Sequence, residues 1–134
     1  MKTIVQVTAA IIVSDGSILI TQRHSRDRLA GLWEFPGGKI EAGETPEQCL
    51  KRELWEELEM DAGIGHYLGS SIYHYDHISI ELMAYRAFWN GVSFRLVSHQ
   101  ACRWVRPDQL ADFSFTPADL PFVQRLADGK IDIG

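Results

Sequence analysis

Apolar and polar positions alternate along the first part of the chain. The opening run TIVQVTAAIIV is rich in β-branched residues, SILITQR alternates, and Asp15-Gly16 lies between the two. This pattern predicts a β-hairpin. A polar, basic loop, HSRDRLAG, follows, and then the short apolar run LWEF and the turn PGGK.

The hydrophobic period changes after this turn and becomes helical. Thr45 is a favourable capping residue, Pro46 suits the first helical position, and Gln48 completes a T-x-x-Q capping box. Apolar side chains then recur at three- and four-residue spacing, at Cys49, Leu50, Leu54 and Leu58. We therefore expect a helix from about Pro46 to about Met60.

Strand patterns return after the helix. GIGHYLGSSIYHYDH, ISIELMAYRAFW and CRWV each predict a strand, Pro107 to Leu110 suggests one helical turn, and TPADLPFVQRL predicts a last helix that Thr116 caps and Pro117 opens. The tryptophans are expected to pack in the interior: Trp33, Trp55, Trp89 and Trp104. With no internal repeat, the sum is a mixed α+β domain, with helices packed on a strand-rich core.

Composition and charge narrow the class of protein. With 134 residues, 46% hydrophobic and 23% charged, the chain fits a single globular domain over residues 1–134. A net charge of −5 with mixed signs argues against binding duplex nucleic acid or an anionic membrane. Polar residues interrupt the apolar start, which is too short to cross a bilayer and lacks the order of a secretory signal. Two cysteines form no disulfide framework, so a cytoplasmic location is expected.

Three acids gather on the predicted helix in the stretch RELWEEL. Glu53 faces Glu56 and Glu57 at three- and four-residue spacing, and each like-charged pair costs about 0.2–0.5 kcal/mol. Arg52 can pair with Glu56, but Glu53 and Glu57 have no basic neighbour on their own face. A solvated acidic face is the ordinary interpretation of such a cluster.

The segment before the helix favours a different interpretation. PGGKIEAGE is dense in glycine and can bring backbone carbonyls and amides close to a ligand. Carboxylate oxygens and a carbonyl are the hard donors that Mg²⁺ or Mn²⁺ prefers, and Mg²⁺ commonly binds substrate phosphates through a few such groups. Loop and acids together predict metal-assisted phosphate chemistry.

The spacing of these residues resembles a known motif. Gly38, five residues, Glu44, seven residues, the run Arg52 to Glu57, one residue and then Glu59-Met60 is similar to the Nudix box of the Nudix hydrolases, G-x5-E-x7-R-E-U-x-E-E-x-G-U with U aliphatic. Every charged position matches. Glu59 stands where the family usually has glycine, a change expected to lengthen or restyle the end of the helix.

The resemblance extends through most of the chain. GLWEFPGGKIEAGETPEQ is similar to the MutT branch, and HQACRWV with FTPADLPFVQRL is similar to the bacterial CTP pyrophosphohydrolase subgroup. It implies an α+β Nudix fold, in which a mixed β-sheet is packed between helices as an α/β/α sandwich. It also implies Mg²⁺-dependent hydrolysis of a nucleoside diphosphate linked to a further group. In the MutT branch, water attacks the β-phosphorus of a nucleoside triphosphate and gives a nucleoside monophosphate and pyrophosphate.

Site residues follow from the same resemblance. The expected ligands of Mg²⁺, or of Mn²⁺ as a substitute, are the side chains of Glu53, Glu56 and Glu57 with the backbone carbonyl of Gly37. Glu53 is the expected general base. Arg52 is expected to hold the glutamates in position, although an ordinary i,i+4 ion pair accounts for it equally well. Glu44 is expected to reach the metal indirectly or through water.

One departure from the MutT branch concerns catalysis. Members of that branch often carry a glutamate in the loop before the segment matching Gln100 to Trp104, where it contacts metal or acts as base. This chain has Ser98 at that place, within VSHQ. Serine does neither job well, so either Glu53 removes the proton alone, or His99 contributes, or activity is modest.

Substrate choice depends on residues outside the motif. By resemblance, Glu34 and Asp119 lie in the base pocket, Arg23 contacts substrate, and Phe35 and Tyr75 line or stack on the base. Two ionised carboxylates only accept hydrogen bonds, which favours bases with exocyclic amines or ring N–H groups, such as cytosine, with 8-oxoguanine still open. Asp119 could instead be a helix-terminal acid, and aromatic residues in strands are commonly core.

Three functional hypotheses remain open from the sequence. The leading one is a nucleoside triphosphate pyrophosphohydrolase that removes CTP-like or oxidised nucleotides, with a small nucleotide as its partner and a monomer or homodimer as its assembly. A second is hydrolysis of another diphosphate, such as ADP-ribose or a dinucleotide. A third is a nucleotide-binding module without turnover, which Ser98 keeps open and the intact acids oppose.

Overall fold

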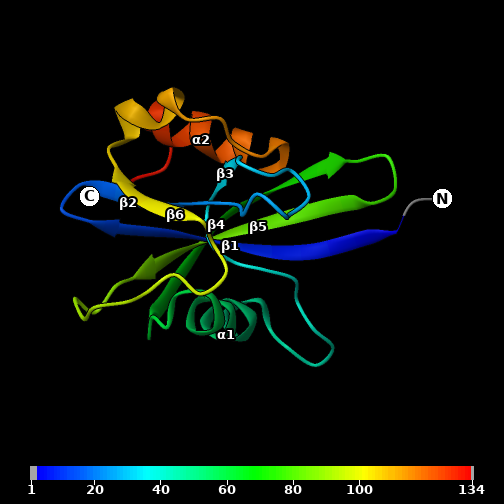
Figure 1. Ribbon diagram of the computed structural model, residues 1–134, viewed down its shortest axis with the longest axis horizontal. Helices are drawn as coiled ribbons and strands as arrows, with labels where there is room; N and C mark the ends of the chain where they lie inside the picture. The colour runs from blue at the N-terminus through cyan, green and yellow to red at the C-terminus, as the bar shows by residue number, and fades with distance from the viewer. Residues whose placement is uncertain (1–2, 134) are drawn as a thin grey trace.

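A six-stranded mixed β-sheet forms the middle layer of the computed structural model, which describes residues 3–133 (Figure 1). The strands run in the order β3-β2-β1-β5-β4, and β6 pairs with β2. Strands β1 and β5 are parallel, and the other pairs are antiparallel. Their bounds are β1 (Ile4–Ser14), β2 (Ser17–Gln22), β3 (Trp33–Glu34), β4 (Gly63–His74), β5 (Ser79–Phe88) and β6 (Ala101–Val105).

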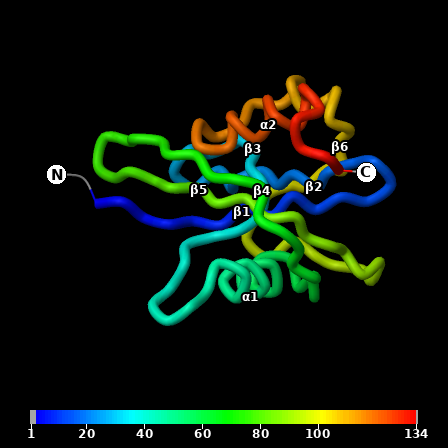
Figure 2. The backbone as a smooth tube through the Cα atoms, turned by 180° about the vertical axis from the view of Figure 1, so that it is seen from behind, coloured from blue at the N-terminus to red at the C-terminus, as the bar shows by residue number. Residues whose placement is uncertain are grey.

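Helices cover both faces of this sheet. Helix α1 (Pro46–Leu58) lies on one face and α2 (Leu120–Ala127) on the other, as Figure 1 and the reverse view in Figure 2 both show. Two 3₁₀ segments, η1 (Pro107–Asp112) and η2 (Pro117–Asp119), precede α2. The predicted sandwich of a mixed sheet between helices is therefore confirmed. No helix in the described part of the chain is long and apolar enough to cross a membrane.

Strand β1 contributes to the hydrophobic cores on both sides of the sheet. Ala9 and Ile11 pack in the core beneath α2, while Ala10 and Ile12 pack in the core beneath α1. All four side chains are fully buried. A central strand that pairs in parallel and is covered on both faces requires a continuous apolar run, which explains the sequence TAAIIV.

The opening hairpin was predicted correctly. Val13 pairs with Ile18 and Ser14 with Ser17, so Asp15 and Gly16 form a two-residue turn. Both turn residues have positive φ, 50° and 77°. This is the backbone twist that tight hairpins require, and Asp-Gly is among the sequences that adopt it most readily.

Helix α1 begins as predicted and ends earlier. Thr45 Oγ1 accepts a hydrogen bond from the Gln48 amide at 3.1 Å, and the Gln48 side chain accepts one from the Thr45 amide at 3.0 Å. The predicted end near Met60 is wrong, because Glu59 adopts the left-handed conformation (φ 49°, ψ 37°) and stops the helix at Leu58. Glu59 thus takes the backbone geometry that glycine usually supplies at this place.

Two further expectations need correction. The last α-helix begins at Leu120, after a 3₁₀ turn, and the Thr116 hydroxyl donates to the Asp119 carboxylate instead of capping a backbone amide. Trp55 is not a packing residue, because it is 57% exposed on α1. Trp89 and Trp104 do pack together, with ring centroids 5.4 Å apart.

Candidate active site

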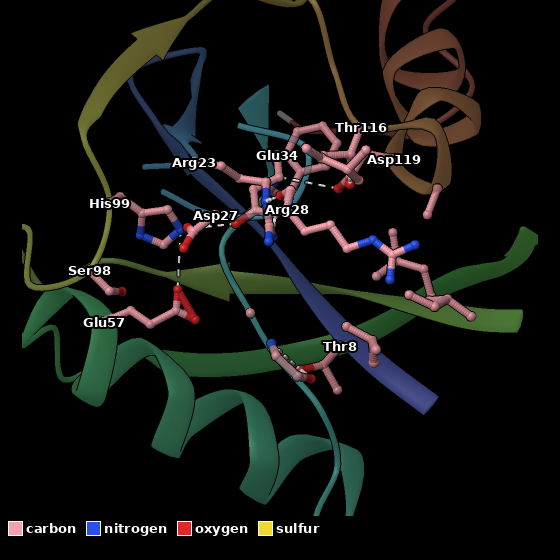
Figure 3. Close-up of a pocket in the computed structure, with 18 of the residues that line it drawn as sticks. Thr8, Arg23, Asp27, Arg28, Glu34, Glu57, Ser98, His99, Thr116 and Asp119 are labelled. Atoms are coloured by element: carbon pink, nitrogen blue, oxygen red, sulfur yellow. Dashed lines mark hydrogen bonds and ion pairs between the residues drawn. The ribbon is translucent and has the colours of Figure 1, made fainter. Parts of the chain in front are cut away.

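A cavity of about 360 Å³ opens beside the sheet and collects residues that are far apart in the sequence (Figure 3). All five residues predicted to bind substrate line it: Arg23, Glu34, Phe35, Tyr75 and Asp119. Gly37 and Glu57, from the predicted metal set, line it as well. The lining does not include Arg52, Glu53 or Glu56, which lie on α1 outside the cavity wall.

The glycine-containing loop is attached to β1 through its backbone. The Thr8 amide donates to the Gly38 carbonyl and the Ala10 amide to the Pro36 carbonyl, each at 2.8 Å. In an extended segment successive carbonyls point in opposite directions. The Gly37 carbonyl therefore points away from β1 and is available to a ligand.

Main-chain contacts at Gly37 exclude any side chain, and a side chain at position 38 would displace the Glu53 carboxylate. A β-carbon at position 37 would lie 2.1 Å from the Thr8 carbonyl oxygen, and one at position 38 would lie 2.3 Å from the carboxylate carbon of Glu53. Glycine at both positions lets the loop lie between β1 and α1. The result is that the loop backbone and the Glu53 carboxylate are in direct contact.

Arg52 is the centre of the charged cluster on α1. Its guanidinium donates to Glu44 at 2.6 and 2.9 Å, to Glu53 at 2.8 Å and to Glu56 at 2.7 Å. Hydrogen bonding to Arg52 lowers the pKa of Glu44 to about 2, and Glu44 in turn raises the pKa of Arg52. The expectation that Glu53 lacks a basic neighbour is wrong, because the long side chain of Arg52 reaches the adjacent residue.

Glu57 lies apart from this cluster and contacts His99. His99 Nε2 is 3.0 Å from Glu34 Oε2 and 3.3 Å from Glu57 Oε2 (Figure 3). The His99 side chain is only 5% exposed. Burial, followed by the nearby charges of Glu34 and Glu53, raises the pKa of Glu57. A histidine and two partly buried acids from three different segments of the chain therefore meet at one end of the cavity.

The predicted base pocket is assembled around Asp119. Its carboxylate accepts hydrogen bonds from the Phe35 amide at 3.2 Å and from the Thr116 hydroxyl. Glu34 accepts from Arg23 at 3.0 Å. Burial, opposed by the hydrogen bond from Thr116, raises the pKa of Asp119 to about 7. Burial thus shifts Asp119 toward the protonated form, in which the carboxyl group can donate as well as accept, whereas the sequence prediction treated it as an ionised acceptor.

Two aromatic side chains complete the wall. Phe35 is 3% exposed, and its ring lies 5.5 Å from that of Phe115. Tyr75 packs edge-on against Tyr73 with centroids 4.6 Å apart, and burial raises the pKa of its hydroxyl. Both residues line the cavity.

Comparisons with known proteins agree on one family. The family model described as NUDIX domain matches residues 4–126. The chain belongs to the Nudix family. It is 39% identical over 124 residues to a CTP pyrophosphohydrolase of Escherichia coli, covering 90% of this chain and 89% of that protein. It is 38% identical over 127 residues to an 8-oxo-dGTP diphosphatase of Haemophilus influenzae, covering 93% of each.

A solved structure supports the same assignment. The solution structure of the E. coli ORF135 protein superposes with a TM-score of 0.83 at 34% identity, covering 98% of this chain and 94% of that one. The predictions of a Nudix fold and of an enzyme of this family are confirmed. Nudix hydrolases generally use a divalent metal ion.

The side chains of this Nudix domain suit a divalent cation in chemistry but do not converge on one point. Within residues 3–133, no three His, Cys, Asp or Glu side chains are arranged to enclose a metal ion. Glu53 and Glu56 turn toward Arg52, and Glu57 turns toward His99. The available donors are carboxylates and the Gly37 carbonyl, a hard oxygen set that fits a divalent cation.

Several residues that line the Nudix cavity were not identified from the sequence. Asp27, Arg28 and Leu29 come from the basic loop after β2. The arginine-rich composition of HSRDRLAG, directly after a strand, was the available signal. Thr8 on β1 gave no signal, since a threonine in an apolar strand is indistinguishable from a core residue until the loop is placed against it.

Proposed function

We propose that this chain hydrolyses nucleoside triphosphates to a nucleoside monophosphate and pyrophosphate, with Mg²⁺ or with Mn²⁺ as a substitute. CTP-like and oxidised nucleotides are the proposed substrates, and removal of damaged nucleotides is the proposed role. The observation that carries the proposal is one cavity lined both by the proposed base-pocket residues and by Glu57 of α1. A reducing cytoplasm and a monomer or homodimer complete the proposal.

The metal site in this proposal consists of Glu53, Glu56, Glu57 and the Gly37 carbonyl. A bound divalent cation would neutralise the polyphosphate and lower the pKa of a coordinated water. Glu53, held against the glycine loop, is the proposed base for that water. Glu56 is half exposed at 50% of its side chain, so it is free to turn from Arg52 toward a ligand.

Substrate selection is assigned to the cavity residues that lie outside α1. Phe35 and Tyr75 contact the faces of the base, and Arg23 fixes Glu34 beside it. Glu34 accepts hydrogen bonds from an exocyclic amine or a ring N–H. Asp119, with a pKa of about 7, both accepts and donates, which accommodates cytosine as well as the altered edge of an oxidised guanine.

Pyrophosphate release is the direct test of this function. Purified protein should release pyrophosphate from CTP or 8-oxo-dGTP when Mg²⁺ is present and none when it is chelated. Phosphate products from ADP-ribose alone would favour the second hypothesis, and binding of nucleotide without turnover would favour a non-catalytic module.

Replacing Glu53 tests the proposed base. Glu53→Gln should lower turnover by about 10²–10⁴-fold with folding preserved, because a ligand charge and the base are both removed. Glu47→Gln is a matched control on the first turn of the same helix, where the side chain is exposed and outside the Arg52 cluster. Near-normal turnover in Glu53→Gln would overturn this assignment.

A further inference from the structure

His99 contacts two acids of the cavity, Glu34 and Glu57, that are far apart in the sequence. It lies in the loop before β6, while Glu34 belongs to β3 and Glu57 to α1. One nitrogen, Nε2, is within 3.3 Å of a carboxylate oxygen from each acid. Figure 3 shows the imidazole directly above the Glu57 carboxylate, with a dashed contact between them.

Nε2 faces both carboxylates but contacts them differently. It is hydrogen-bonded to Glu34 Oε2 at 3.0 Å, and it lies 3.3 Å from Glu57 Oε2, which is an ion-pair distance. The other ring nitrogen, Nδ1, is buried and has no hydrogen-bond partner among the described residues. Arg23 donates to the other oxygen of Glu34 at 3.0 Å, so Arg23 and His99 together orient this carboxylate.

We propose that His99 is a positioning residue that couples base binding at Glu34 to divalent-cation binding at Glu57. The proposal rests on the proposed function, which makes Glu57 a metal ligand and Glu34 a base contact. When Glu57 turns toward a cation, its carboxylate leaves Nε2, and Glu34 is then the one acid of the pair that still faces this nitrogen. The Glu34 carboxylate is thereby fixed between Arg23 and His99 in the geometry that receives the base.

Coupling of this kind acts in both directions. If the cation raises affinity for the base, the base must raise affinity for the cation by the same factor. The residue before His99 is Ser98, which has no carboxylate, and it is His99 that contacts Glu57 from this loop. Its contribution is therefore expected in affinity and its metal dependence, with no proton transfer assigned to it.

Calorimetry on the whole chain measures this coupling without turnover. CMP and 8-oxo-dGMP are the probes, each titrated with saturating Mg²⁺ and with chelator, into wild type, His99→Leu and His99→Gln. Mg²⁺ should raise the affinity of wild type for at least one probe by about fivefold or more. Leucine, which has no donor, should remove most of that increase, and glutamine, whose amide nitrogen replaces Nε2, should restore part of it.

Controls separate this result from a structural defect and from direct bridging. Bridging of Mg²⁺ to the probe's phosphate is the same in all three proteins and cancels in the comparison. Gln100→Ala, in the same loop with its side chain on Gln22, should keep the wild-type ratio. Thermal unfolding checks that each variant folds.

The possible outcomes are distinct. An unchanged Mg²⁺ effect in His99→Leu, no Mg²⁺ effect in wild type, or no binding of either probe would overturn the coupling. If His99→Leu fails to fold, the test depends on His99→Gln. The same Mg²⁺-induced increase in probe affinity in His99→Gln and wild type supports the coupling, and loss of that increase in His99→Gln overturns it. The proposed function fails separately, by absence of pyrophosphate release from wild type.

Discussion

At the scale of single residues, burial changes what a side chain offers to a ligand. Asp119 is 5% exposed, and its pKa is raised to about 7, whereas an exposed aspartate is ionised at that pH. A sequence gives the residue type but not its protonation state, because desolvation depends on which segments cover it. Here the covering residues, such as Phe35, come from 84 positions away.

The raised pKa of Asp119 predicts how stability depends on pH. Between about pH 4 and pH 7 the folded chain keeps a proton that the unfolded chain releases, so this residue's contribution to the free energy of unfolding falls as pH rises and levels off above about pH 7. The shift corresponds to roughly 4 kcal/mol. Asp119→Asn removes this contribution, which urea unfolding of both proteins across that range will measure.

Other carboxylates also titrate in this range, so the comparison depends on the difference between the two proteins. Asparagine at position 119 should gain stability relative to wild type with each step toward pH 7. Parallel stability curves for wild type and Asp119→Asn would contradict the assigned pKa.

At the scale of elements, α1 shows which features are readable from local sequence. Its beginning depends on Thr45, Pro46 and Gln48, all within one turn, and it was predicted correctly. Its end depends on the left-handed conformation of Glu59, which glutamate adopts only at a cost in free energy. The residue types around Glu59 therefore did not predict that the helix ends at Leu58. The cost is about 1 kcal/mol for a residue with a side chain.

Relieving this conformation predicts a more stable helix end. Glu59→Gly should raise the free energy of unfolding by about 0.5–1 kcal/mol, since glycine adopts positive φ without strain. The exposed ion pair between Glu59 and Arg95, at 2.8 Å, is lost at a cost of about 0–1 kcal/mol. Arg95→Ala measures that loss alone. If Glu59→Gly still has a lower free energy of unfolding than wild type after the loss measured in Arg95→Ala is subtracted, the proposed backbone strain at Glu59 is refuted.

At the scale of the whole molecule, local patterns predicted the fold better than the site. Strand periods, the Asp-Gly turn and the capping box predicted most element bounds, and the resemblance added the layers. The residues of the proposed base pocket were predicted only through resemblance, and the charges around them depend on tertiary contacts that no local pattern contains. His99 in particular became a buried link between acids only once β3, α1 and the loop before β6 were placed together.

The crowding of acids predicts that a divalent cation stabilises the whole fold. Mg²⁺ that binds the folded chain at 100 times its dissociation constant adds about 2.7 kcal/mol and should raise the melting temperature by several degrees. Chelator should reverse the shift, and Glu57→Gln should reduce it. If Mg²⁺ leaves the melting temperature of wild type unchanged, the result would count against the proposed metal ligands. Scanning calorimetry provides the measurement.

The contact of Gly37 with the Thr8 carbonyl has a consequence for protein engineering. The Thr8 main chain leaves no room for a side chain at position 37, while the cavity is also lined by side chains from a separate surface loop, including Arg28. If the cavity receives the base as proposed, substitutions in that surface loop should change base preference and leave the glycine loop in place. Directed evolution of specificity should accumulate changes there and spare both glycines.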